Sequence, residues 1–224
     1  MGLFKKRLIA CLLGLTSLYG GTLIQDAKMQ ALYLMQQKKV EESIERYREL
    51  ANLSGRHDFE LLQQMGLILL QKGILDEDPQ NFLMTLFGAG FSNCVQALEI
   101  LEKGLNQIDP QIQLLALNFI ARHDDDRSHE LLLKAMSSDY LSTRMEAAFH
   151  LALKKHPHAV GHIEGLMFRL PPVFKPYFPP LFALIGTNDA TAALKRLIED
   201  LDTAVRVESI LQVAHLGRDD FLPL

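Results

Sequence analysis

Apolar residues near the end of the chain recur at the spacing of an amphipathic helix. Four of them, between positions 202 and 217, fall at i, i+3, i+4 and i+7: Val207, Ile210, Leu211 and Ala214. This spacing predicts a buried stripe on one face of a helix. Asp202 can cap the start of that helix and Gly217 can end it. A single helix cannot bury its own stripe, so neighbouring helices are expected.

The same pattern recurs about every 31 residues along the chain. Steps of 31 residues back from Val213 lead to Phe182, Leu151 and Ile120. The same steps back from Ala214 lead to Ala183, Ala152 and Ala121. A second helix repeats as well, in three rows: Leu132, Ile163 and Leu194; Ala135, Leu166 and Leu197; Met136, Met167 and Ile198. Two helices per repeat predict an all-α solenoid of stacked helical hairpins, with the alanines in a row inside the stack.

The run LKRLIEDLDTAVRVESILQVAHLG, residues 194–217, resembles the short HEAT-like repeat of the phycobilisome-lyase type of HEAT protein. That family's pattern has an aspartate, an arginine four residues later, and alanines and leucines at helical spacing; Asp202 and Arg206 match it. Other copies depart from it, with Gln113 or Lys175 in place of the arginine. The resemblance covers about half the chain and implies a helical repeat fold, which serves many functions.

The N-terminal half predicts helical hairpins of another kind. Residues 27–50 resemble a tetratricopeptide unit, and LLQQMGLILLQKG, residues 61–73, resembles the first helix of another. The matching positions are Ala31, Leu34, Ser43 and Tyr47. A further apolar helix around Leu86 is expected to end at Gly88 and Gly90. The predicted organisation is thus tetratricopeptide-like hairpins and a joint over residues 25–93, followed by HEAT-like repeats over residues 94–224.

The first 24 residues have the layout of a secretory signal peptide. Lys5, Lys6 and Arg7 precede an uncharged, leucine-rich run from Leu8 to Ile24. A retained membrane anchor is the alternative, although the run is short for a bilayer. Cys11 follows a lipobox-like Leu-Ile-Ala, but the apolar run continues beyond it, so we interpret it as part of the signal. The pattern predicts an exported or membrane-tethered protein, whose membrane contact is confined to this segment.

Composition excludes some partners. The formal charge is −4, and loss of the N-terminal segment removes three positive charges, so no electrostatic basis remains for binding nucleic acid phosphates. Only Cys94 would then remain of the two cysteines, which excludes an intramolecular disulfide. We interpret Cys94 as a small core residue.

Catalytic and metal-binding patterns are incomplete. His129 and Glu130 begin the HExxH zinc motif, but Leu133 stands where its second histidine belongs. His158 and His162 have the i, i+4 spacing of metal ligands, although a polar turn between helices explains them as well. The acidic run after His123 is interpreted as a turn in which Asp126 or Ser128 caps the next helix. We therefore expect no catalytic residues, no metal and no cofactor.

One repeat is interrupted by prolines at positions 171, 172, 176, 179 and 180. Proline breaks a helix interior, so this first helix is predicted to be short and to begin near Pro179 or Pro180. The same segment holds five aromatic residues: Phe168, Phe174, Tyr177, Phe178 and Phe182. Two interpretations stay open. The rings form a docking patch, with Phe174, Tyr177 and Phe178 as candidate docking residues, or they fold inward to fill the gap.

Arg144, Lys175 and Arg206 occupy one register position in successive repeats. We interpret them as a structural ladder, each near acidic residues of the previous repeat.

Taken together, the sequence patterns lead to the hypothesis of a protein-protein interaction scaffold of the exported or envelope compartment, with an unidentified protein partner. The HEAT resemblance implies an alternative, a bilin-lyase-like enzyme, and a purely structural envelope component is a third. Residues 221–224 match the opening of a further second helix, so a longer chain or a covering partner is expected.

Overall fold

The computed structural model describes residues 23–156 and 158–217, and within those ranges it contains helices and no strand. The predicted all-α class is confirmed there. Within the same ranges, no helix has the length and apolar character needed to cross a membrane. The predicted signal peptide and the helix expected from Phe221 fall almost entirely outside the described residues. The chain divides into two compact units, Met1–Gly88 and Ala89–Leu224.

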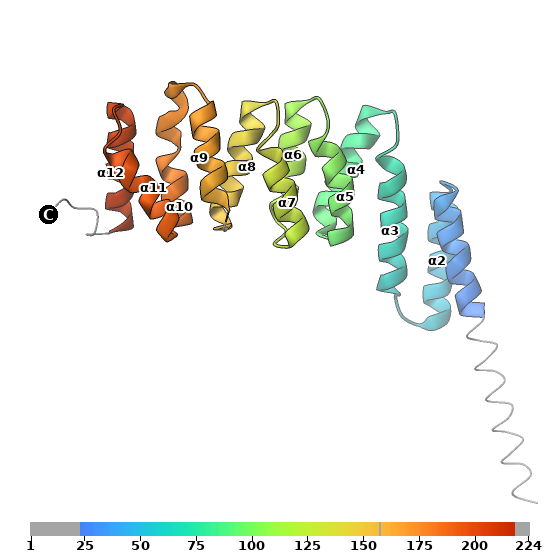
Figure 1. Cartoon of the computed structure of the whole chain (residues 1–224). Coiled ribbons are helices and arrows are strands. Elements are labelled where there is room, and N and C mark those ends of the chain that lie inside the picture. Colours follow the sequence, from blue (N-terminus) through green and yellow to red (C-terminus); the bar gives the residue numbers. More distant parts are fainter. Residues whose placement is uncertain (1–22, 157, 218–224) are drawn as a thin grey trace, which may run out of the picture. The chain divides into compact units, whose positions relative to one another are not determined.

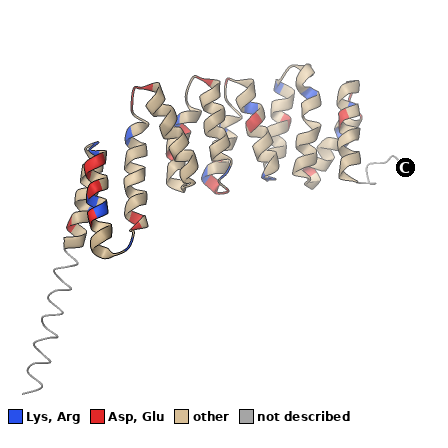
Figure 2. Cartoon of the chain, turned by 180° about the vertical axis from the view of Figure 1, so that it is seen from behind, with Lys and Arg blue, Asp and Glu red and all other residues tan. Residues whose placement is uncertain are grey.

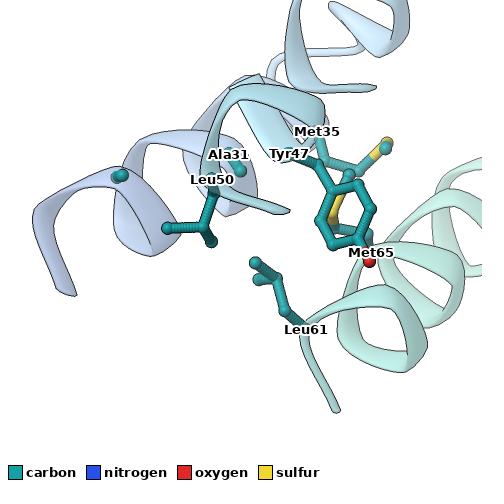
Figure 3. Close-up of a cluster of buried hydrophobic side chains, with 7 residues drawn as sticks. Ala31, Met35, Tyr47, Leu50, Leu61 and Met65 are labelled. Carbon is teal, nitrogen blue, oxygen red and sulfur yellow. The ribbon is translucent and has the colours of Figure 1, made fainter. Parts of the chain in front are cut away.

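The first unit is built from helical hairpins. A helix over residues 23–36 is followed by α2 (Val40–Ser54), α3 (Phe59–Gly73) and the beginning of α4 (Pro79–Ser92). Buried side chains join the first three helices: Ala31, Met35, Tyr47, Leu50, Leu61 and Met65 (Figure 3). The fully buried Ser43 hydroxyl donates to the Ala31 carbonyl at 2.6 Å. The hairpin predicted from Ala31, Ser43 and Tyr47 is therefore confirmed as a hairpin.

Helix α4 passes through both glycines that were expected to end it, so that prediction is wrong. It ends instead beside Asn93, whose φ is 46°. The glycines are needed for close helix contacts. A Cβ on Gly88 would lie 2.9 Å from Leu70 Cδ2, and one on Gly90 would lie 2.1 Å from Phe119 Cγ.

The second unit consists of helices arranged in two rows (Figure 1). The first helices of successive repeats are α6 (Pro110–Ile120), α8 (Leu141–Leu153), the pair η2 (Pro172–Tyr177) and α10 (Pro179–Ile185), and α12 (Thr203–Leu216). The second helices are α5 (Leu98–Leu105, after the short η1, Val95–Ala97), α7 (Asp126–Ala135), α9 (Ala159–Arg169) and α11 (Asn188–Ile198). In the first row α6 packs on α8, α8 on α10, and α10 on α12; in the second, α5 packs on α7 and α9 on α11.

Burial confirms most of the predicted register. The row of Ile120, Leu151, Phe182 and Val213 is buried, and the rows of the second helices are buried except for the partly exposed Ile198. The alanine row is wrong at its last member. Ala152 is fully buried, Ala121 and Ala183 are partly buried, and Ala214 is exposed.

The stripe predicted for α12 is also wrong. Val207, Ile210 and Leu211 are exposed, and α12 instead buries Val205, Ser209 and Val213. The reason is the position of its neighbours. Helix α12 packs against η2, α10 and α11, and no described helix covers its other face.

The proline-rich repeat has the predicted short helix. The 3₁₀ segment η2 replaces the first turns, and α10 begins at Pro179 with Pro180 in its first turn. Proline is tolerated there because the first amides of a helix have no intrahelical acceptor. Gly186, with φ of 66°, ends α10 in the left-handed conformation.

Candidate partner-binding surface

The aromatic residues of the proline-rich segment divide into two groups. Phe178 and Phe182 are buried, with 0% and 1% of their surface exposed. Phe168 and Tyr177 are 73% and 63% exposed, and Phe174 is partly buried. Phe178 is therefore excluded as a docking residue, since its ring helps to fill the space beside the shortened helix. Burial thus confirms that part of the segment folds inward, and docking by the exposed rings stays a prediction.

A groove lies between α9 and α11. The groove has a volume of about 650 Å³, and its charged or titratable lining residues are His158, His162, Glu164, Asp189 and Arg196. A smaller depression of about 120 Å³ shares Glu164 and Arg196 and extends to Phe168, Lys175 and Asp200. Arg196 donates a hydrogen bond to the Glu164 carboxylate, which ties the two helices together. Figure 2 shows acidic and basic residues spread along the described part of the chain.

The α9 wall of the groove is low because it contains glycine. Gly161 lines the groove, and a Cβ at this position would meet nothing within 4 Å. Glycine inside a helix costs roughly 0.5–1 kcal/mol relative to alanine. Close packing therefore does not account for the glycine at position 161.

Lys175 and Arg206 both bind around Asp200. Lys175 forms an ion pair with the Asp200 carboxylate, and Arg206 Nη1 donates to the Asp200 carbonyl at 2.8 Å. Burial raises the pKa of Asp200, but hydrogen bonds from Lys175 and the Asp202 amide, with the charges of Lys175 and Arg206, outweigh it and leave the pKa below its ordinary value. This anchors the loop between α11 and α12.

The three residues of the expected ladder do not form one uniform set of contacts. Arg206 lies near Asp200, an acid at the end of the previous repeat, as expected, although it binds the backbone carbonyl of Asp200 and not its carboxylate. Lys175 pairs with an acid at the end of its own repeat, and not with one of the previous repeat as expected. Arg144 forms no ion pair among the described residues, and its Nε is buried without a hydrogen-bond partner.

Histidines gather where α7 and α9 meet the α8–α9 connection. The ring of the buried His156 lies 5.1 Å from that of His129 and 5.7 Å from that of His158. The His158 backbone amide donates to His156 Nδ1 at 3.3 Å. Burial lowers the pKa of His156, and the charges of His129, His158 and His162 lower it further.

These histidines do not form a metal centre in the described part of the chain. No group of three or more His, Cys, Asp or Glu side chains lies close enough there to hold a metal ion. His158 and His162 line the groove instead.

Two other sequence predictions concern single residues. Cys94 is only partly buried, with its thiol against Gln96, so it is not the core residue that was predicted. The cap of α7 is Asp125, which forms a capping box with Ser128, rather than Asp126.

Two features were not foreseen from the sequence. The groove was missed, because residues such as Glu164 and Arg196, 32 positions apart, come together only when α9 and α11 pack. The first unit also contains an apolar cavity of about 480 Å³, which Met35, Leu69 and Met84 line together with Lys38 and Lys72.

No protein-family model matches this chain, and no curated protein matches its sequence. What bears on function is therefore the surface itself: a groove with mixed charge, an open glycine wall and the exposed ring of Phe168 in the adjoining depression.

Proposed function

We propose that the protein is a protein-binding scaffold, and that its docking surface consists of the α9–α11 groove with Phe168 and Tyr177. The observation that carries this proposal is the unequal burial within one short segment. Phe178 and Phe182 are buried, while Phe168 and Tyr177 stay exposed. Exposed aromatic rings beside a polar groove are typical of protein interfaces, where they act as anchors.

The sequence patterns support the same function. HEAT-like and tetratricopeptide-like repeats, which the chain resembles, build extended surfaces suited to binding other proteins. The N-terminal pattern of Lys5, Lys6, Arg7 and a leucine-rich run supports an exported or membrane-tethered location. The partner would accordingly be a protein of that compartment.

The test compares two aromatic substitutions with a matched control. In the double variant Phe168→Ser with Tyr177→Ser, partner recovery from the native compartment should fall at least about tenfold, because interface anchors contribute about 2 kcal/mol or more each. Phe149→Ser is the control, since Phe149 is also an exposed aromatic of this unit but lies on α8, away from the groove.

Thermal melting of each variant accompanies the recovery assay. Little change is expected, because exposed rings contribute little to folding. Equal recovery by the double variant and the wild-type chain would contradict the proposed surface, as would equal loss with Phe149→Ser.

A further inference from the structure

A side-chain contact recurs at one register position of the second unit. Ser138 Oγ donates to Gln113 Oε1 at 2.8 Å, and the two residues are 25 positions apart. Two repeats later, Lys175 and Asp200 occupy the same register positions and form an ion pair, again 25 positions apart. In the repeat between them, these two positions are held by Arg144 and Arg169. Two cations thus stand where the other repeats have a matched pair.

Neither arginine has an acidic partner among the described residues. Arg144 Nε is buried and makes no hydrogen bond there. Arg169 Nε donates to the Gly165 carbonyl at 2.9 Å, which is a neutral acceptor. Asp139, in the loop before α8, forms no ion pair with Arg144 in this part of the chain.

The surrounding repeats show what this one lacks. Glu102 accepts from Lys134 at 2.8 Å, and Glu164 pairs with Arg196 at the equivalent positions two repeats later. In the intervening repeat, Leu133 replaces the glutamate and Gly165 replaces the cation. The fold therefore supplies no carboxylate for Arg144 and Arg169 at the register where carboxylates occur elsewhere.

We propose that Arg144 and Arg169 together bind a carboxylate of an acidic segment of the partner protein, which deepens the proposed function and rests on it. A guanidinium matches a carboxylate in a two-bond fork, and a carboxylate between two guanidiniums also removes their mutual repulsion. A polypeptide segment is favoured over a free anion because the site continues into the docking surface. Arg169 directly follows Phe168, which is exposed and lines the depression that adjoins the groove.

The experiment follows the Nε–H resonances of Arg144 and Arg169 by NMR while acetylated hexaglutamate is added to the full chain at about 0.15 M salt. Saturable shifts of both resonances are expected. Arg144→Gln and Arg169→Gln should each weaken hexaglutamate binding about tenfold or more, as expected for a lost charge-assisted bond. Arg48→Gln, an exposed arginine of the first unit, is the charge-matched control and should bind like the wild-type chain. If Arg144→Gln fails to fold, Arg169→Gln, at an exposed position, keeps the test open.

Three results would overturn the proposal. The first is that the two arginine resonances do not shift, and the second is that Arg48→Gln weakens hexaglutamate binding as much as the other variants do. The third is that inorganic phosphate binds as tightly as hexaglutamate, which indicates a small-anion site. The aromatic variants separate this proposal from the scaffold function. If the aromatic variants lose the partner but the wild-type chain does not bind hexaglutamate, the carboxylate site is wrong and the scaffold function stands. If the wild-type chain binds hexaglutamate but the aromatic variants recover the partner normally, the docking surface is wrong. The partner is then no longer the source of the carboxylate.

Discussion

Helical glycines in this chain fall into two groups that the sequence does not distinguish. Some allow close contact: a Cβ on Gly73 would lie 2.2 Å from Thr85 Oγ1, and one on Gly90 would lie 2.1 Å from Phe119 Cγ. Others face open space, as Gly66, Gly161 and Gly165 do. The same substitution to alanine should therefore have opposite effects in the two groups.

Gly90→Ala should lower the free energy of unfolding by about 1–3 kcal/mol, because the added methyl group overlaps a ring that is nearly fully buried. Gly165→Ala, in the open group, should raise it by about 0.5–1 kcal/mol through the better helix propensity of alanine. Urea denaturation of both variants and the wild-type chain measures the difference. Two changes of the same sign would show that Phe119 moves aside at little cost, and would contradict close packing as the reason for a glycine at position 90 inside α4.

At the scale of elements, the α8–α9 connection places a buried histidine among other titratable groups. His156 is buried between the rings of His129 and His158, with His162 also close enough to lower its pKa. Lys154, two residues earlier, binds the His123 carbonyl and Asp124. A proton on His156 would add a buried positive charge among these groups.

This environment predicts a pH-dependent stability. Because the pKa of His156 is lowered in the folded chain, the unfolded chain binds more protons below the ordinary value of 6.5. The contribution of the neutral, buried His156 to the stability of the folded chain is therefore complete above pH 6.5 and is lost as the pH falls. His150, whose pKa is also lowered, first by burial, acts in the same direction.

The free energy of unfolding should fall between about pH 7.5 and about pH 5.5, above the range in which most carboxylates titrate. His156→Gln should reduce that fall, whereas His215→Gln, at an exposed position on α12, should keep the wild-type dependence. Urea titrations at several pH values measure it. A slope unchanged in His156→Gln would show that His156 does not titrate differently in the folded and unfolded chains.

The sequence could predict the helix register in the second unit, but not which face of every helix is buried. The rows through Leu132, Ile163 and Leu194 are buried because each repeat places them against the same neighbours. Helix α12 carries apolar residues on two faces, and the richer face, with Val207 and Ile210, is exposed. Which face is buried depends on the neighbours a helix has, and the hydrophobic pattern of a single helix does not contain that information.

The candidate site shows the same limit. Proline positions predicted the short helix, since proline acts on its own backbone. They did not predict that Phe178 turns inward while Tyr177 stays outside, because that depends on space left by other helices. The groove depends on α9 and α11 lying side by side. Its lining residues, such as His158 and Arg196, come from separate helices, so no local pattern identifies them.

At the scale of the whole molecule, the chain forms two compact units, and within them helices pack mainly on their neighbours in the sequence. Stability in helical-repeat proteins is distributed in this local manner, and such proteins open in parts. Residues 23–88 and the described residues from 89 onward are therefore expected to respond separately to a local loss of stability.

Two buried serines test this expectation reciprocally. Ser43 donates to the Ala31 carbonyl in the first unit, and Ser128 donates to the carbonyls of His123 and Asp125 in the second. Both are fully buried, so substitution by alanine removes a buried hydrogen bond and should cost about 0.5–1.5 kcal/mol. Ser43→Ala should accelerate amide hydrogen exchange in the first unit alone, and Ser128→Ala in the second alone, as measured by mass spectrometry of peptic peptides. Faster exchange throughout the chain in either variant would show that the two units unfold as one cooperative structure, because loss of one hydrogen bond would then lower the stability of every buried amide equally.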